Sequence, residues 1–248
     1  MFTKRRQLLK VLAIGNSFSQ DATRYLADLA KSAGERLKVV NLYIGGCSLD
    51  THYRNMLSEK AAYSLEFGGA ATGFFVSIKE ALLSDSWDYV TIQQASLLSV
   101  NYDTYQPYAS ALVDYIRLHV PKAKVLVHMT WAYEEGSQRL ANLGFAHFED
   151  MSKEVFASYR KLAEDVQADG IIPSGEVLLG LYRAGITEIH RDTFHASLGV
   201  GRYALALTWF ATIFGKRVGE LESIGLDVPC EEQILCATRE IVDKTVFG

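Results

Sequence analysis

The hydrophobic positions of this chain form short apolar runs that alternate with longer stretches of helical periodicity. Short apolar runs bounded by polar residues or glycine are typical of buried strands, whereas apolar residues three and four positions apart predict amphipathic helices. We predict strands over five ranges: Leu12–Gly15, Lys38–Ile44, Tyr89–Gln93, Lys124–Thr130 and Gly170–Pro173. We predict helices over six ranges: Asp21–Ser32, Tyr108–His119, Phe148–Ala168, Gly175–Ala184, Val200–Phe214 and Glu231–Val246.

Strands that alternate with helices favour an α/β fold, because each helix returns the chain so that the next strand pairs in parallel. Five such strands predict a flavodoxin-like three-layer αβα sandwich with a mostly parallel sheet. No linker or internal repeat divides residues 1–248, so we predict a single domain. The pattern is weakest over residues 51–79, which we interpret as a candidate insertion over the active site.

The most informative segment is VLAIGNSFSQDATRYLADLAKSAG, in which a short apolar strand stops at Gly15 and Asn16 and a helical pattern follows. It places Ser17 at the carboxyl end of a strand, where open α/β sheets bind ligands. The amino terminus of the following helix also favours negative charge. Ser17 is therefore a candidate nucleophile. The alternative is that Ser17 or Ser19 only caps the helix, since serine is a favoured cap.

A second candidate group lies in ITEIHRDTFHASLGVGRYALALTWFATIFG, just before an apolar helical pattern. Asp192 and His195 are three positions apart there, so one short loop can hold a carboxylate against an imidazole. A serine nucleophile needs such a base, and the base needs a partner that fixes its tautomer. The alternative is a turn-forming aspartate beside a histidine that faces water.

Three segments resemble sequence blocks of the SGNH hydrolases, also called GDSL-type esterases. VLAIGNSFS resembles the first block, with Asn16 where most members have aspartate, and NLYIGGCSLD resembles the second, with Gly46 at the glycine position. RDTFHASLGVGRYALA is similar to the fifth block. The resemblance implies the SGNH hydrolase fold. It also implies Ser17 as nucleophile, His195 as general base and then acid, and Asp192 as the group that orients His195.

The same resemblance implies an oxyanion hole made by the N–H groups of Ser17 and Gly46 and by an asparagine side chain from a third block. That asparagine is missing, and WDYVTIQQASLLS stands in its place. A glutamine amide is the same kind of donor, so we expect Gln94 to complete the hole, with Gln93 as the alternative. Adjacent strand residues point to opposite faces, but counting does not decide between the two glutamines.

Aromatic residues follow several predicted strand ends, where an α/β sheet builds its pocket. Trp131 and Tyr133, in MTWAYEEG, are candidate substrate-binding residues, because aromatic faces beside polar groups suit a sugar ring. The alternative is that both belong to the core. The resembled family includes carbohydrate acetylesterases, lysophospholipases and thioesterases, and the variation in the third block is nearest to the carbohydrate esterase branches.

We therefore expect a serine esterase that hydrolyses a small acyl ester, an O-acetylated carbohydrate, through a Ser-His-Asp acyl-enzyme mechanism. Two alternatives stay open at this point. One is a catalytically weak carbohydrate-binding module on the same fold, and the other is an acyltransferase that uses the same triad. The expected partner in each case is a small-molecule or glycan ester, and the sequence leaves the oligomeric state open.

Composition excludes several other classes. The chain has a formal net charge of −4 with scattered charges, so we expect no surface for nucleic acid. No run approaches the ~18 apolar residues of a membrane span. Neither the three cysteines nor the histidines His52, His128 and His147 have metal-ligand spacing. We therefore expect reduced thiols, no metal site and no cofactor.

The basic run Lys4–Arg6, with Lys10 behind it, precedes the first apolar stretch and mimics the start of a signal peptide. Lys10 interrupts the apolar part, and no small-residue cleavage site precedes the strand that carries the candidate nucleophile. We interpret the run as a solvated tail and expect a cytoplasmic protein. A chain from which a signal peptide had been removed would look the same and would be periplasmic or secreted.

Overall fold

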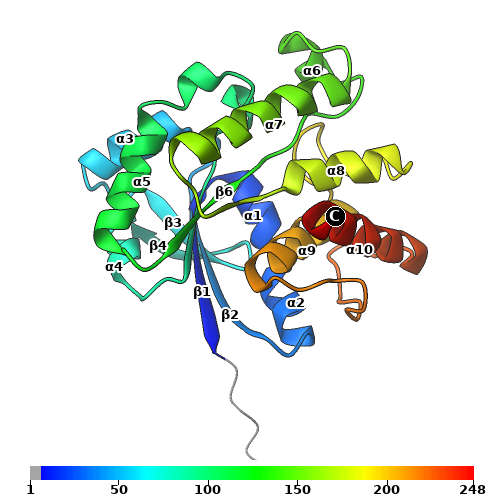
Figure 1. The fold of residues 1–248 in the computed structure, drawn as a ribbon, viewed down its shortest axis with the longest axis horizontal. Coiled ribbons are helices and arrows are strands. Elements are labelled where there is room, and N and C mark those ends of the chain that lie inside the picture. Colours follow the sequence, from blue (N-terminus) through cyan, green and yellow to red (C-terminus); the bar gives the residue numbers. More distant parts are fainter. Residues whose placement is uncertain (1–6) are drawn as a thin grey trace, which may run out of the picture.

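The computed structural model of the protein describes residues 7–248, and the basic run Lys4–Arg6 lies outside them. Within that range the centre is a seven-stranded sheet with the order β4-β3-β2-β1-β5-β6-β7 (Figure 1). The parallel strands are β1 (Leu8–Gly15), β2 (Arg36–Tyr43), β5 (Tyr89–Ile92), β6 (Lys124–His128) and β7 (Gly170–Ile172). At one edge β3 (Tyr63–Phe67) and β4 (Ala70–Val76) form an antiparallel hairpin beside β2.

The parallel strands are the predicted ones, with ends that differ by a few residues. The segment Val11–Ile14 of β1 is buried because helices cover both faces of the sheet, and such strands read as continuous apolar runs. The prediction of five strands is wrong, because the hairpin adds two antiparallel ones. Nearly all of β4 is exposed, so it lacks the apolar alternation by which a strand is recognised.

Residues 51–79 therefore do not form an insertion over the active site. They contain most of helix α3 (Leu49–Leu57), the edge hairpin and the start of α4 (Ile78–Leu83). None of them lines the cleft described below. The hairpin instead supports the sheet and the first helix, since Glu66 accepts hydrogen bonds from Gln20 Nε2 at 2.8 Å and from Asn41 Nδ2 at 2.9 Å.

Helices cover both faces of the sheet, as predicted for an α/β fold (Figure 1). On one side, α3, α4 and α5 (Tyr108–His119) contact one another. On the other, α9 (Val200–Phe214) contacts α1 (Ser17–Thr23), α2 (Leu26–Ser32) and α8 (Ser174–Arg183), and α10 (Glu232–Phe247) packs on α8 and α9. The remaining helices are α6 (Gln138–Asn142), α7 (Phe148–Asp165) and two 3-10 turns, Ser96–Leu98 and Tyr102–Thr104.

The long helix predicted over Asp21–Ser32 is two helices that meet at Tyr25. Tyr25 is buried, and its hydroxyl donates to the Leu198 carbonyl and accepts from the Asp227 N–H at 2.7 Å. These contacts with distant segments fix the turn between α1 and α2. The first helix also begins earlier than predicted, at Ser17, because Asn16 supplies its cap.

Candidate active site

The carboxyl ends of the central strands meet at one edge of the sheet. Gly15 at the end of β1 pairs in register with Tyr43 at the end of β2, and Ile14 pairs with Ile92 at the end of β5. The loops that follow these three strands therefore converge. This edge is where open α/β sheets bind their ligands.

Asn16 joins these loops. Its Oδ1 accepts from Phe18 N at 3.0 Å, which caps α1, and also from Gln93 Nε2 at 2.8 Å. Its Nδ2 donates to the Cys47 carbonyl at 3.1 Å. One buried amide thus holds the ends of β1, β2 and β5 together and leaves the Ser17 hydroxyl free of any capping role.

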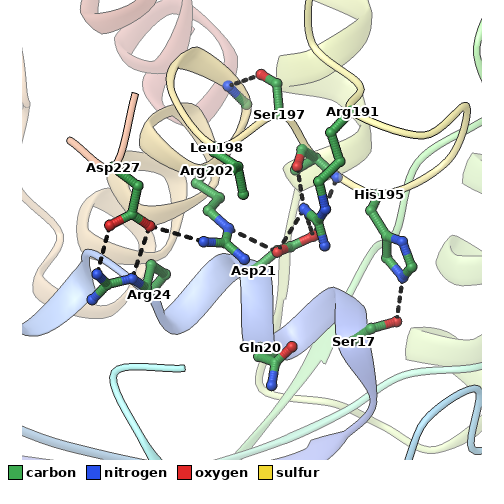
Figure 2. Close-up of polar contacts among 12 residues, drawn as sticks. Ser17, Gln20, Asp21, Arg24, Arg191, His195, Ser197, Leu198, Arg202 and Asp227 are labelled. Atoms are coloured by element: carbon green, nitrogen blue, oxygen red, sulfur yellow. Dashed lines mark hydrogen bonds and ion pairs between the residues drawn. The ribbon is translucent and has the colours of Figure 1, made fainter. Parts of the chain in front are cut away.

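The Ser17 hydroxyl faces an imidazole. Ser17 Oγ lies 2.8 Å from His195 Nε2 (Figure 2), and His195 Nδ1 lies 2.8 Å from Asp192 Oδ2. The structure therefore brings together the three side chains selected from the sequence. His195 does not simply face water, since its side chain is only 17% exposed.

The loop itself fixes how Asp192 meets His195. Asp192 Oδ1 accepts from the His195 backbone N–H at 2.9 Å. Thr193 between them has a φ of 72°, a strained conformation for a β-branched residue, and its carbonyl accepts from Glu134 N at 2.8 Å. Burial raises the pKa of Asp192, but the hydrogen bonds from the side chain and backbone of His195 outweigh burial and lower it overall. Asp192 is therefore ionised and suited to stabilise a protonated imidazole.

A buried carboxylate that no sequence pattern indicated ties this loop to α1. Asp21 has no exposed surface and accepts from Arg191 Nη1 at 3.0 and 2.9 Å and from Arg202 Nε at 2.8 Å (Figure 2). Asp21 lies one turn after Ser17, and Arg191 directly precedes Asp192. The ion pairs therefore hold the helix of the serine against the loop of the histidine.

Further ion pairs extend this network outward. Asp227 accepts from Arg202 Nη1 at 2.9 Å and from Arg24 Nε at 3.0 Å (Figure 2). The only sequence signal for Asp21 was a charged residue at the start of a predicted amphipathic helix, which is not specific. Its partners lie 170 and 181 residues away, so no local pattern could have identified them.

Ser17 and His195 open into a cleft of about 440 Å³. It is lined by Asn16, Ser17, Phe18, Gln20, Tyr43, Gly45, Gly46, Ala95, Ser96, Leu97, Tyr133, Arg139, Arg191, Phe194 and His195. Gly46, expected as an N–H donor, lines the cleft with a φ of 62°, a conformation that favours glycine.

The two glutamines after β5 do not line this cleft. The Nε2 group of Gln94 donates to the carbonyl and to Oγ1 of Thr104 at 3.0 and 3.2 Å, and its Oε1 accepts from Leu49 N at 3.0 Å. The amide nitrogen of Gln94 therefore donates to Thr104, which does not line the cleft, and this contradicts the expectation that Gln94 completes the oxyanion hole. Gln93, the alternative, is buried between Asn16 and His128, whose Nδ1 lies 2.7 Å from Gln93 Oε1.

The residues just beyond the glutamines line the cleft instead. Ser96 Oγ lies 3.1 Å from the hydroxyl oxygen of Tyr133, and both residues line the cleft. A single hydrogen bond between two hydroxyls uses one hydrogen and leaves the other available to a third group. Tyr133, expected as a substrate contact, lines the cleft but is almost fully buried, with 1% of its surface exposed.

Trp131, the other expected substrate contact, belongs to the core. It has no exposed surface, its ring stacks on Phe18 with centroids 4.1 Å apart, and its Nε1 donates to the Phe194 carbonyl at 2.8 Å. Strand alternation does not reveal this difference, because Trp131 and Tyr133 both follow the end of β6. Trp131 therefore packs against Phe18, which lines the cleft, and does not line the cleft itself.

Among residues 7–248, no group of three or more His, Cys, Asp or Glu side chains is placed to hold a metal ion. No helix in the same range is long and apolar enough to cross a membrane.

Comparison with known proteins places the chain in a family. The model of a domain of unknown function, DUF4886, matches residues 10–225. The crystal structure of a DUF4886 family protein from Bacteroides uniformis is similar at 32% identity and a TM-score of 0.89, over 97% of this chain and 95% of that one. A comparison with curated proteins gave no match.

More distant structures share the fold. A candidate SGNH hydrolase from Slackia heliotrinireducens is 24% identical with a TM-score of 0.60, over 84% of this chain and 100% of that one. A carbohydrate esterase family 3 protein from Talaromyces cellulolyticus is 14% identical with a TM-score of 0.55, over 84% and 97%. The protein therefore belongs to the DUF4886 family and has a fold of the SGNH hydrolase type.

Proposed function

We propose that this protein is a serine hydrolase that cleaves a small acyl ester of a carbohydrate through an acyl-enzyme. The observation that carries the proposal is the chain of two 2.8 Å hydrogen bonds from Ser17 through His195 to Asp192. A base within hydrogen-bond reach of a hydroxyl, itself oriented by a carboxylate, is the arrangement that activates a serine.

In the proposed acylation step, Ser17 Oγ attacks the ester carbonyl carbon while His195 Nε2 takes its proton. The negative charge of Asp192 stabilises the imidazolium that forms. Collapse of the tetrahedral intermediate breaks the bond to the alcohol oxygen, which receives the proton from His195. Water then repeats the sequence on the acyl-enzyme, releasing the acid and restoring Ser17.

The oxyanion of the intermediate needs donors that are already in place. The Ser17 N–H lies at the first position of α1, where it has no acceptor within the helix, and Gly46 lines the same cleft. For the third donor we propose the paired hydroxyls of Ser96 and Tyr133 in place of a glutamine amide. Their spare hydrogen supports this assignment, as does the engagement of Gln94 with Thr104.

The carbohydrate part of the proposal is supported by the cleft and by similar folds. A cleft of about 440 Å³ suits a small ligand, and Tyr43 and Phe194 supply aromatic surface beside the polar side chains of Gln20 and Ser96. Similar folds include an acetyl xylan esterase, with a TM-score of 0.56 at 17% identity, and the carbohydrate esterase from Talaromyces cellulolyticus.

The test is active-site labelling together with turnover. A fluorophosphonate is expected to label the wild-type protein, to leave Ser17→Ala unlabelled and to label His195→Ala far more slowly. Ser32→Ala, a serine on α2 outside the cleft, is the matched control and is expected to label normally. Equal labelling of Ser17→Ala would refute the assignment of the nucleophile.

Turnover distinguishes this proposal from the other uses of the fold. Short-chain 4-nitrophenyl esters and acetylated sugars are expected to be hydrolysed by the wild type and not by Ser17→Ala. Calorimetric binding of a glycan with no turnover of any ester would indicate a binding module. Transfer of the acyl group to an added alcohol in preference to water would indicate an acyltransferase.

A further inference from the structure

The cleft beside Ser17 carries positive charge although the chain as a whole is negative. Among residues 7–248 its lining includes two arginines, Arg139 and Arg191, and no aspartate or glutamate. Arg191 is paired with two carboxylates, since its Nη1 lies 2.9 Å from Asp21 Oδ2 and its Nε lies 4.0 Å from Asp192 Oδ2. Of the described residues that line the cleft, Arg139 is therefore the cation whose charge is available to a ligand.

Arg139 is held in place by aromatic faces. Its guanidinium carbon lies 4.1 Å from the centroid of the Phe194 ring and 5.9 Å from that of Tyr133. Among residues 7–248 no carboxylate lies within ion-pair distance of it. Glu135, four positions before it, is bonded instead to His147 Nδ1 at 3.0 Å and to Phe148 N at 2.6 Å.

The position of Arg139 relates it directly to the proposed chemistry. Phe194, which it covers, precedes His195, and the rings of these two residues have centroids 3.8 Å apart. Tyr133, its second aromatic contact, shares a hydrogen bond with Ser96 in the same cleft. The guanidinium therefore lies one ring away from the base and lines the same cleft.

We propose that Arg139 selects an ester that carries a carboxylate, and this inference rests on the proposed hydrolase function. A guanidinium presents two parallel N–H donors that match a carboxylate, and stacking on Phe194 keeps this fork oriented. The positive cleft also raises the local concentration of anionic substrates. The carboxylate belongs either to the acyl group or to the alcohol, for example a sugar acid.

The experiment compares charged and neutral esters in matched pairs. For the acyl side the pair is 4-nitrophenyl hemisuccinate and 4-nitrophenyl butyrate, and for the alcohol side it is O-acetylated glucuronic acid and O-acetylated glucose. The measured quantity is the ratio of kcat/KM for the charged ester to that for the neutral one. In one of the two pairs we expect this ratio to fall about tenfold in Arg139→Gln, mainly through KM, as for loss of a charge-assisted hydrogen bond.

Two variants serve as controls. Arg139→Lys keeps the charge without the fork and is expected to retain part of the preference. Arg217→Gln removes an arginine that also lies over an aromatic ring, Phe247 at 5.3 Å, but outside the cleft, so the ratio is expected to match the wild type. An unchanged ratio in Arg139→Gln for both pairs overturns the proposal.

Failure of the proposed function gives a different result. If the wild type hydrolyses none of the four esters, the hydrolase assignment fails, and binding of glucuronate and glucose is measured by calorimetry. Preference for glucuronate in the wild type that is lost in Arg139→Gln still supports the anion site. Equal or absent binding of the two sugars overturns it.

Discussion

Asp21 and Arg191 form an ion pair of 2.9 Å across 170 residues of sequence, with the carboxylate fully buried. The pair joins the helix that begins with Ser17 to the loop that carries Asp192 and His195. The distance between the proposed nucleophile and its base therefore depends on a contact that includes neither of them. Asp21 is a positioning residue in this interpretation.

The first prediction concerns Asp21→Asn. The substitution keeps the size of the side chain but leaves Arg191 and Arg202 without their shared charge, so we expect a loss of about 3 kcal/mol in the free energy of unfolding. We also expect kcat for 4-nitrophenyl acetate to fall more than tenfold at a temperature where the variant is folded. Denaturant unfolding and steady-state kinetics measure the two effects.

Asp227→Asn is the matched control for this prediction. Asp227 binds Arg202 and Arg24 in the outer part of the same network but does not contact Arg191. It is expected to lower stability less and to leave kcat close to the wild-type value. If Asp21→Asn unfolds more easily but keeps full kcat when folded, Asp21 is structural and has no positioning role.

The second prediction concerns the hydroxyl pair of Ser96 and Tyr133. Loss of one oxyanion donor costs about 10²–10³ in kcat, and the remaining hydroxyl of the pair compensates in part. We therefore expect Ser96→Ala and Tyr133→Phe each to lower kcat about tenfold or more, and the double variant to lower it about 10²–10³-fold. KM for a neutral ester is expected to change less than kcat.

Gln94 supplies the contrast to this pair. Gln94→Met removes the bonds to Thr104 and Leu49, which hold loops behind the site, so its main effect is expected on the free energy of unfolding. A variant that folds stably but loses as much kcat as the Ser96→Ala and Tyr133→Phe double variant would return the donor role to the glutamine. Single-turnover acylation rates separate the two cases.

Much of the fold was predictable because its main signals are local. The bounds predicted for α5 and α9, 108–119 and 200–214, match the observed helices, since long periodic segments carry their own evidence. The hairpin that includes β4 was missed because an exposed edge strand such as Ala70–Val76 has no buried face to mark it. The predicted number of strands was therefore too low, because an exposed strand leaves no apolar pattern in the sequence.

The candidate site was likewise predictable only where its signals are local. Ser17, Asp192 and His195 lie next to recognisable strand and helix boundaries, so their types and spacing indicated chemistry. The hydrogen-bond partner of the Gln94 amide was not predictable, because Thr104 reaches Gln94 only when the loop after β5 folds back. The partners of Asp21 are hidden in the same way, since pairing over long separations leaves no periodic pattern.

The third prediction concerns Gly46. Its φ of 62° is strained for any residue with a Cβ, although a Cβ there would meet no atom within 4 Å. We expect Gly46→Ala to cost about 1 kcal/mol in the free energy of unfolding and to lower kcat, because the N–H is turned as the strain relaxes. Gly45→Ala, next to it but without positive φ, is the control and is expected to retain more activity. Equal kinetics for the two variants would remove Gly46 from the proposed oxyanion hole.

The last prediction concerns the pH dependence of stability. Burial lowers the pKa of His52 and of His128 to about 3 and, as the main cause, that of His190 to about 4. Below pH 6.5 the unfolded chain therefore binds protons that the folded chain does not. Stability is complete above about pH 6.5 and is lost as the pH falls toward 4 and 3, by about 1.4 kcal/mol per pH unit for each histidine.

His128→Gln tests this account, because it removes one of the three buried imidazoles. The ring of His128 lies between Gln93 and Ser174. Between pH 6 and 4.5 the slope of the unfolding free energy against pH is expected to decrease by an amount that corresponds to about one proton bound on unfolding. Urea titration at each pH measures this free energy. In the control His147→Gln the slope is expected to show no such decrease. His147 is exposed, and Glu135 raises its pKa, so its charged form stabilises the fold in acid. An undiminished slope in His128→Gln would mean that His128 takes up its proton without unfolding, which its burial beneath the three strand ends argues against.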